Sequence, residues 1–173
     1  MKNNLQTVAS LLRLQARDVA DPRKALEDSV NRVLAIAAVH EVLTERHDEE
    51  VELRDLLDRL RAMLVQGLAG GKRVEAELEH VSLGGSRATA LALVFSELLQ
   101  NALEHGGDEV RIELAQRKGD AVLAIADSGS GKRRSTEGTG LSIVRALVRD
   151  ELKGSFELRS DGATRAEVVF PIS

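Results

Sequence analysis

Three polar side chains recur at every fourth position of an otherwise apolar segment, namely Glu97, Asn101 and His105. If the segment is helical, this spacing places all three on one face. Asn101 offers a neutral oxygen of the kind that ligates Mg²⁺ together with phosphate oxygens and water. Glu97, one turn earlier, would then lie near a terminal phosphate, where a carboxylate orients an attacking nucleophile or accepts its proton. A solvated helix face is the alternative interpretation of the same spacing.

A second group of polar residues follows an apolar, strand-like segment and reads Asp-Ser-Gly-Ser-Gly over residues 127–131. The carboxylate of Asp127 can accept a hydrogen bond from an exocyclic amine such as that of adenine. Gly129 and Gly131 have no side chains, so a flat ring can lie against the backbone there. A plain turn is the competing interpretation, because Asp, Ser and Gly are common turn residues.

The third group is Gly-Thr-Gly-Leu-Ser-Ile-Val over residues 138–144, in which glycines open an amphipathic helix. The free amides of Gly138, Gly140 and Leu141, with the positive end of the helix dipole, can cradle phosphate. The spacing is neither that of the Walker loop nor that of the dinucleotide fingerprint. The polar residues 132–137 before it either close over a triphosphate or form a solvated loop.

Composition limits the classes of function. The chain has 173 residues, of which 43% are hydrophobic and 30% charged, with a formal net charge of -4 and no cysteine. It can build a folded core, and it offers no global attraction for nucleic acid or anionic membrane. The longest apolar runs are too short to span a bilayer, so we expect a cytoplasmic protein without membrane insertion.

The elements that must position these residues follow from periodicity. Apolar spacings of three and four predict a helix over residues 1–19 and a second helix beginning at Asp21-Pro22, which pack as an antiparallel hairpin. In the second helix, Leu26, Val30, Val33 and Ala37 form one stripe, whose surplus apolar surface predicts pairing with a second copy or packing on the rest of the chain. We expect a boundary near residue 48, separating domains at 1–47 and 48–173.

After that boundary, helices and strands alternate. We predict helices over 51–69, 86–105 and 141–148, and strands over 74–78, 110–115, 121–126, 154–159 and 164–170. The fold class is therefore α/β, a mixed or antiparallel sheet covered by helices on one face and preceded by the hairpin.

Together, the three groups resemble the N, G1 and G2 boxes of the Bergerat-fold (GHKL) ATPases, which include DNA gyrase, heat-shock chaperones and histidine kinases. The N box is matched by Glu97 to Ala102 with His105-Gly106, and Gly162-Ala163-Thr164 is similar to that superfamily's Gly-x-Thr element. The resemblance covers about residues 51–173 and implies ATP and Mg²⁺ as cofactors. The implied nucleotide-binding residues are Asn101, His105, Asp127, Gly129, Gly131, Lys132, Gly138, Thr139, Gly140, Leu141 and Thr164, with Asn101 holding the metal and Glu97 catalytic.

The hairpin resembles the dimerisation and phosphoacceptor domain of the second histidine-kinase subfamily, which is allied to the HWE kinases. The resemblance rests on Lys-Asn-Asn-Leu-Gln over residues 2–6 and Ala-Val-His-Glu over residues 38–41. Family hairpins open His-Arg-(Val or Met)-Lys-Asn-Asn, which implies an acceptor histidine two positions before Met1 and absent from this chain. His40 is either a substitute acceptor or a packing residue.

The resemblance implies a homodimeric protein histidine kinase core of a two-component system. The γ-phosphoryl group would pass from ATP to a hairpin histidine and then to an aspartate of a response-regulator receiver domain. Two alternatives stay open: an anti-sigma-factor-like serine kinase, which would phosphorylate a serine of a partner protein, and a non-catalytic module in which ATP only orders a loop.

Overall fold

The computed structural model describes residues 6, 9, 10, 13, 21–46, 49–68, 70–129 and 139–173. Within them, the elements are α2 (Pro22–Arg46), β1 (Glu50–Glu52), α3 (Leu53–Leu68), β2 (Arg73–Leu78), β3 (Ser82–Gly84), α4 (Gly85–His105), β4 (Glu109–Arg117), β5 (Asp120–Asp127), α5 (Thr139–Asp150), β6 (Ser155–Ser160) and β7 (Thr164–Pro171). The expected first helix falls largely outside the described residues.

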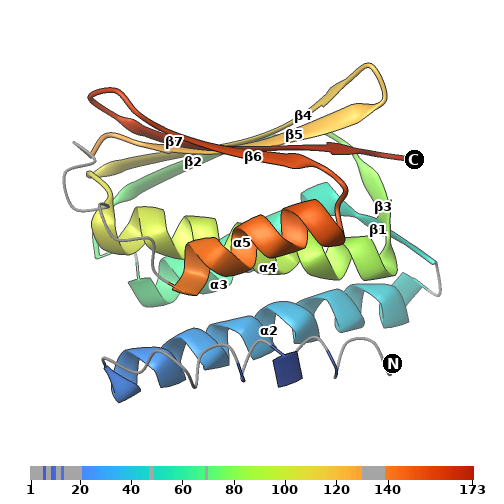
Figure 1. Ribbon diagram of the computed structural model, residues 1–173, viewed down its shortest axis with the longest axis horizontal. Helices are drawn as coiled ribbons and strands as arrows, with labels where there is room; N and C mark the ends of the chain where they lie inside the picture. Colours follow the sequence, from blue (N-terminus) through green and yellow to red (C-terminus); the bar gives the residue numbers. More distant parts are fainter. Residues whose placement is uncertain are drawn as a thin grey trace.

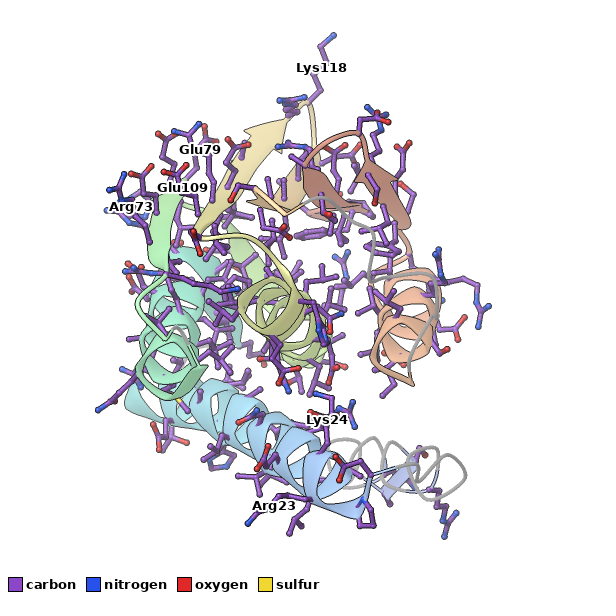
Figure 2. The ribbon with its side chains drawn as sticks, turned by 90° about the vertical axis from the view of Figure 1, so that its left-hand side faces the viewer. Arg23, Lys24, Arg73, Glu79, Glu109 and Lys118 are labelled. Carbon is purple, nitrogen blue, oxygen red and sulfur yellow. The ribbon has the colours of Figure 1, made fainter. Side chains whose placement is uncertain are left out.

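The molecule is layered, with a five-stranded sheet on one side, helices α3, α4 and α5 beneath it, and α2 beneath those helices (Figure 1). The strand order is β2-β4-β5-β7-β6, in which β2 and β4 are parallel and the other neighbours antiparallel. Figure 2 shows Lys24 between α2 and the helices above it, and Lys118 at the tip of the β4–β5 hairpin. The expected mixed sheet with helices on one face is confirmed.

The β4–β5 hairpin forms where turn residues were expected. Arg117 pairs with Asp120, and the two residues between them, Lys118 and Gly119, have φ angles of 47° and 90°. Positive φ at both central residues matches the twist of the flanking strands. The hairpin fixes the register that brings Asp127, at the far end of β5, opposite Thr164 of β7.

Helix α4 is the central helix and packs against α2, α3 and α5. Its buried apolar residues include Leu91, Val94, Phe95, Leu98, Leu99 and Ala102. The helix begins after Gly84, and no side chain caps its first turn by a hydrogen bond. At its other end, the ammonium group of Lys72 donates to the carbonyl oxygen of Gly106 at 2.9 Å, a favourable place for a cation.

Two short strands were not predicted. β1 and β3 pair antiparallel, and their central residues, Val51 and Leu83, are buried. The helix expected from residue 51 therefore begins at Leu53, whose amide donates to the carbonyl oxygen of Val81 at 2.8 Å. Three-residue strands are too short for an alternating pattern to be visible in sequence.

Helix α2 starts as expected, since the Asp21 carboxylate accepts the amide of Arg23 at 3.1 Å. The structure does not pack most of the predicted stripe on the rest of the chain, so its pairing with a second copy stays a prediction. Arg32, Ala35, Ala38, Val39 and Val42 are buried, whereas Leu26, Val30 and Val33 of the stripe are 66%, 49% and 50% exposed. His40 is also exposed, so the packing interpretation of that residue is wrong. The small residues of α2 face α4 because they allow the two helices to approach closely.

Helix α5 lies beside α4 under the sheet and buries Leu141, Ile143, Val144, Leu147 and Val148. Among the residues whose placement is described, no helix has the length and apolarity needed to cross a membrane.

Candidate functional site

Asp127 ends β5 in a buried position, with only 4% of its surface exposed. Its Oδ1 accepts the amide of Gly129 at 2.9 Å and, at the long distance of 3.4 Å, that of Gly107. The backbone at Gly106 and at Gly129 approaches this carboxylate closely. A Cβ placed on Gly106 would lie 2.6 Å from Asp127 Cγ, and one on Gly129 would lie 2.9 Å from Asp127 Oδ1. The lack of side chains in these loops is therefore what admits the carboxylate.

Thr164 stands directly opposite Asp127 in the β5–β7 register and is 1% exposed. Its Oγ1 is buried and has no hydrogen-bond partner among the described residues. Buried hydroxyl groups are normally partnered, so an orphan beside a buried carboxylate indicates a place for a polar ligand or a water molecule.

A small cavity joins three of the expected site residues, Asn101, Asp127 and Leu141. Its volume is about 20 Å³, and its remaining walls are apolar: Leu98, Ala102, Ile125, Leu158 and Ala166. Apolar walls with one amide and one carboxylate fit a flat ring that carries an amine. The volume holds about one water molecule, whereas small-molecule pockets typically measure roughly 300–1,000 Å³. A nucleotide base would have to widen this cavity, which is lined by Leu158 of β6 and Leu141 of α5.

Glu97 lies on α4 one turn before Asn101 and is 5% exposed, so the interpretation of this residue as part of a solvated face is wrong. Its Oε1 accepts a hydrogen bond from Nε of Arg32, a residue of α2 that is 4% exposed. Its Oε2 faces the first turn of α5, where a Cβ on Gly140 would lie 2.6 Å from it. The carboxylate thus touches α2 on one side and α5 on the other.

Burial raises the pKa of Glu97 above the ordinary carboxyl value, and the hydrogen bond and charge of Arg32 oppose that effect without cancelling it. The carboxyl group is therefore a stronger base than an exposed glutamate, while Arg32 favours its charged form.

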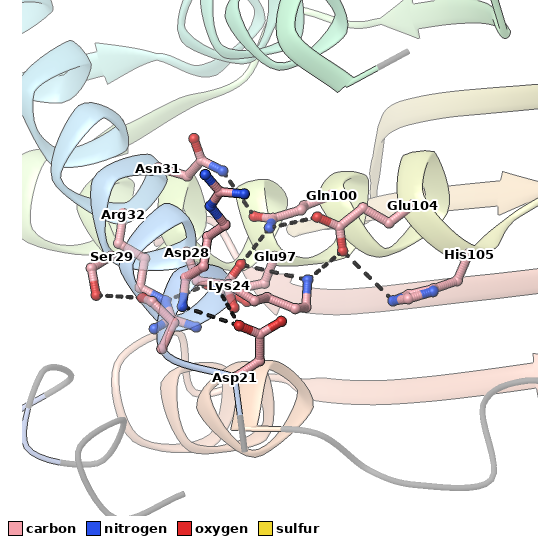
Figure 3. A network of polar contacts seen from close by, with 12 residues as sticks. Asp21, Lys24, Asp28, Ser29, Asn31, Arg32, Glu97, Gln100, Glu104 and His105 are labelled. Atoms are coloured by element: carbon pink, nitrogen blue, oxygen red, sulfur yellow. Dashed lines mark hydrogen bonds and ion pairs between the residues drawn. The ribbon is translucent and has the colours of Figure 1, made fainter. Parts of the chain in front are cut away.

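A row of polar contacts, which we call the α2–α4 seam, continues from this pair (Figure 3). Gln100 accepts from the side-chain amide of Asn31 at 3.3 Å and donates to Asp28 Oδ1 at 2.6 Å. Lys24 Nζ donates to Glu104 Oε2 at 2.6 Å. Burial lowers the pKa of Lys24, but the hydrogen bond to Glu104 and the charges of Asp28 and Glu104 outweigh it, so the net direction is upward. The seam fixes α2 against the helix that carries Glu97 and Asn101.

The other expected residues lie around this centre or outside the described part. His105 is the last residue of α4, and its Nε2 lies 3.6 Å from Glu104 Oε2 with the side chain 46% exposed. Thr139 and Gly140 open α5. Gly131, Lys132 and Gly138 lie outside the described residues. No cluster of three metal-ligating carboxylates or histidines occurs among the residues whose placement is described. A metal here would depend on Asn101 and on the oxygens of its substrate.

Sequence reasoning missed Arg32. A signal was present, because Arg32 shares a helical stripe with Ala35, Val39 and Val42 at offsets of three, seven and ten. The predicted stripe of Leu26, Val30, Val33 and Ala37 does not include Arg32.

Comparisons with known proteins agree over both halves of the chain. Residues 1–68 match the family described as histidine kinase, and residues 86–173 match the family described as histidine kinase-, DNA gyrase B-, and HSP90-like ATPase. The chain is 39% identical to the sensor histidine kinase PdtaS of Mycobacterium tuberculosis and 38% identical to that of Mycolicibacterium smegmatis. These alignments cover 99% of this chain but 37% and 38% of those proteins. The chain therefore spans less than two-fifths of the length of these relatives.

Solved structures show the same fold. The histidine kinase domain of the blue-light activated histidine kinase EL346 from Erythrobacter litoralis has a TM-score of 0.81 at 20% identity, covering 96% of this chain and 84% of that one. The mycobacterial sensor histidine kinase MprB has a TM-score of 0.60 at 21% identity, covering 71% of this chain and 96% of that one.

Proposed function

The chain belongs to the histidine kinase-, DNA gyrase B- and HSP90-like ATPases, as its motifs predict, and from that premise we propose that it is the ATP-dependent core of a sensor histidine kinase. In this proposal it binds Mg-ATP and transfers the γ-phosphoryl group to a hairpin histidine. The phosphoryl group then passes to an aspartate of a response regulator.

The observation that carries the proposal is that Asp127 is paired with Thr164 in the sheet and shares a cavity with Asn101 of α4 and Leu141 of α5. The carboxylate and the orphan hydroxyl fit the amine edge of adenine, and the start of α5 fits phosphate. These residues lie on different elements, so their meeting does not follow from turn or cap chemistry.

Glu97 carries the chemical step in this proposal. A neutral imidazole nitrogen attacks the γ-phosphorus, the bond from that phosphorus to the bridging oxygen breaks, and ADP leaves. The Glu97 carboxylate receives the proton that the imidazole loses, and its raised pKa suits this role. The side-chain oxygen of Asn101 would hold Mg²⁺, which neutralises phosphate charge when bound. Asp127 and Thr164 orient the base, so catalysis rests mainly on positioning.

The partner surfaces are also proposals. The exposed apolar stripe on α2, formed by Leu26, Val30 and Val33, is the surface that we assign to a homodimer through the hairpin. A receiver domain would approach the hairpin as well, since that is where the phosphorylated histidine would lie.

Calorimetry with a nonhydrolysable ATP analogue and Mg²⁺ tests the nucleotide site. Losing one charged hydrogen bond costs roughly 1.5–3 kcal/mol, so Asp127→Asn should weaken binding about tenfold to a hundredfold. The matched control is Asp120→Asn, an exposed carboxyl at the other end of the same strand, which should bind normally. Equal affinities for the two variants would contradict the adenine assignment.

Labelled ATP distinguishes the kinase from its alternatives. The chain is extended by His-Arg before Met1, which completes the hairpin opening that the family resemblance implies. An acid-labile phosphoryl label on the extended chain supports the histidine kinase. Loss of that label in an Asn101→Ala variant would show that phosphoryl transfer depends on the nucleotide site. Acid-stable label on an added protein would instead favour a serine kinase, and binding without label would favour a nucleotide-gated module.

A further inference from the structure

Arg32 is a buried cation whose hydrogen bonds are incomplete. Its Nε donates to Glu97, while its Nη1 is buried and has no hydrogen-bond partner within the described part of the chain. A guanidinium carries five N–H donors in a rigid fork and cannot be neutralised by losing a proton. An orphan donor on such a group therefore indicates a missing acceptor.

The charges around Arg32 indicate what kind of acceptor fits. Of the charged side chains that are buried among the described residues, Glu97 and Asp127 are acidic and Arg32 alone is basic. A triphosphate bound beside Glu97 would bring further negative charge into a site with little access to water. A guanidinium is the group whose fork matches phosphate oxygens.

The position of Arg32 places it at the phosphate end of the candidate site. Glu97 contacts Arg32 through Oε1 and faces Gly140, in the first turn of α5, through Oε2. Arg32 and the helix start thus approach one carboxylate from two sides. The cavity that holds Asn101 and Asp127 lies one turn further along α4, on the side of Leu141.

We propose that Arg32 is a ligand for the terminal phosphate of the nucleotide, supplied to the site by helix α2. Its Nε keeps the hydrogen bond to Glu97, and its free Nη1 donates to an oxygen of the γ-phosphate. A diphosphate lacks that oxygen, so it leaves Nη1 without a partner. Helix α2 then distinguishes a nucleoside triphosphate from a diphosphate through one side chain. This inference rests on the proposed function, because it requires a nucleotide in the site.

The test compares the affinities of Mg²⁺ complexes of AMP-PNP and ADP by calorimetry. Arg32→Gln should lower AMP-PNP affinity about tenfold or more, the usual effect of one charged hydrogen bond, and leave ADP affinity within about twofold. Arg32→Lys keeps the positive charge but lacks the forked guanidinium. Its affinity for AMP-PNP should lie between that of Arg32→Gln and that of the unmodified chain. The matched control is Lys24→Gln, which removes another α2–α4 seam contact, to Glu104, and should leave the ratio of the two affinities unchanged.

Two outcomes overturn the inference: Arg32→Gln affects both nucleotides equally, or it affects neither. If Arg32→Gln does not fold, the double variant Arg32→Gln with Glu97→Gln removes both buried charges, and its ADP affinity verifies an intact site. A fall in the AMP-PNP to ADP affinity ratio of that double variant supports the inference, and an unchanged ratio overturns it. If the unmodified chain binds neither nucleotide, the proposed function itself fails, which is a separate result.

Discussion

Replacing Arg32 by Met should destabilise the protein by far more than the loss of an ordinary surface ion pair. The side chains of Arg32 and Glu97 are 5% and 7% exposed, so the substitution leaves a carboxylate buried without its cation. Breaking such a pair from one side typically costs about 3–5 kcal/mol, against a total stability of roughly 5–15 kcal/mol for a domain. Replacing both partners, as Arg32→Met with Glu97→Leu, should recover most of that loss because no buried charge remains.

Urea denaturation at pH 5 and pH 8 measures both the loss and its cause. Burial raises the pKa of Glu97 in the folded state, so the native protein retains this proton at a higher pH than the unfolded chain does. Stability therefore falls as pH rises from the ordinary carboxyl pKa through the raised one. Arg32 opposes that fall. The deficit of Arg32→Met relative to the unmodified chain should then be larger at pH 8 than at pH 5.

A matched control is Arg59→Met, which removes an exposed contact of 3.5 Å between α3 and Glu41 of α2. Exposed pairs contribute about 0–1 kcal/mol, so this variant should lose little at either pH. The reasoning would be refuted if the single and double variants at Arg32 were equally destabilised, or if the deficit of Arg32→Met did not depend on pH.

Three further predictions concern the site and the exposed helix face. Gly140→Ala places a Cβ 2.6 Å from Glu97 Oε2. We expect the rate of phosphotransfer by the His-Arg-extended chain to fall at least tenfold, with a much smaller change in the melting temperature. Normal turnover would contradict the placement of Glu97. Thr164→Val removes a buried hydroxyl that has no partner among the described residues. Urea denaturation should show equal or slightly higher stability, while calorimetry should show weaker binding of the ATP analogue. A marked loss of stability would show that the hydroxyl is hydrogen-bonded in solution. Val30→Glu adds a charge to a side chain that is 49% exposed; light scattering should then show dissociation of a dimer with little change in melting temperature, and an unchanged dimer would remove the α2 stripe as the interface.

Periodicity was a reliable guide where one element faces one environment. The strands of the main sheet were predicted within a few residues of their observed bounds. The pairing of Asp127 with Thr164 depends on the β5–β7 register, which the spacing of residues in the sequence alone did not predict. The burial of Glu97 was not predictable from its own position, since its carboxylate lies between Arg32, 65 residues away in sequence, and Gly140 at the start of α5.

Helix α2 shows why the sequence was misleading there. It carries two apolar stripes: a bulky one through Leu26, Val30 and Val33, and a small one through Ala35, Ala38 and Val39. Larger side chains contribute more hydrophobic free energy when buried, and the sequence left open whether a second copy or the rest of the chain covers the bulky stripe. The structure buries the smaller stripe against α4, where close approach of the two backbones lets Arg32 reach Glu97. The bulky stripe stays exposed on this chain, so a helix with two apolar faces has one face for the catalytic unit and one still available for a partner.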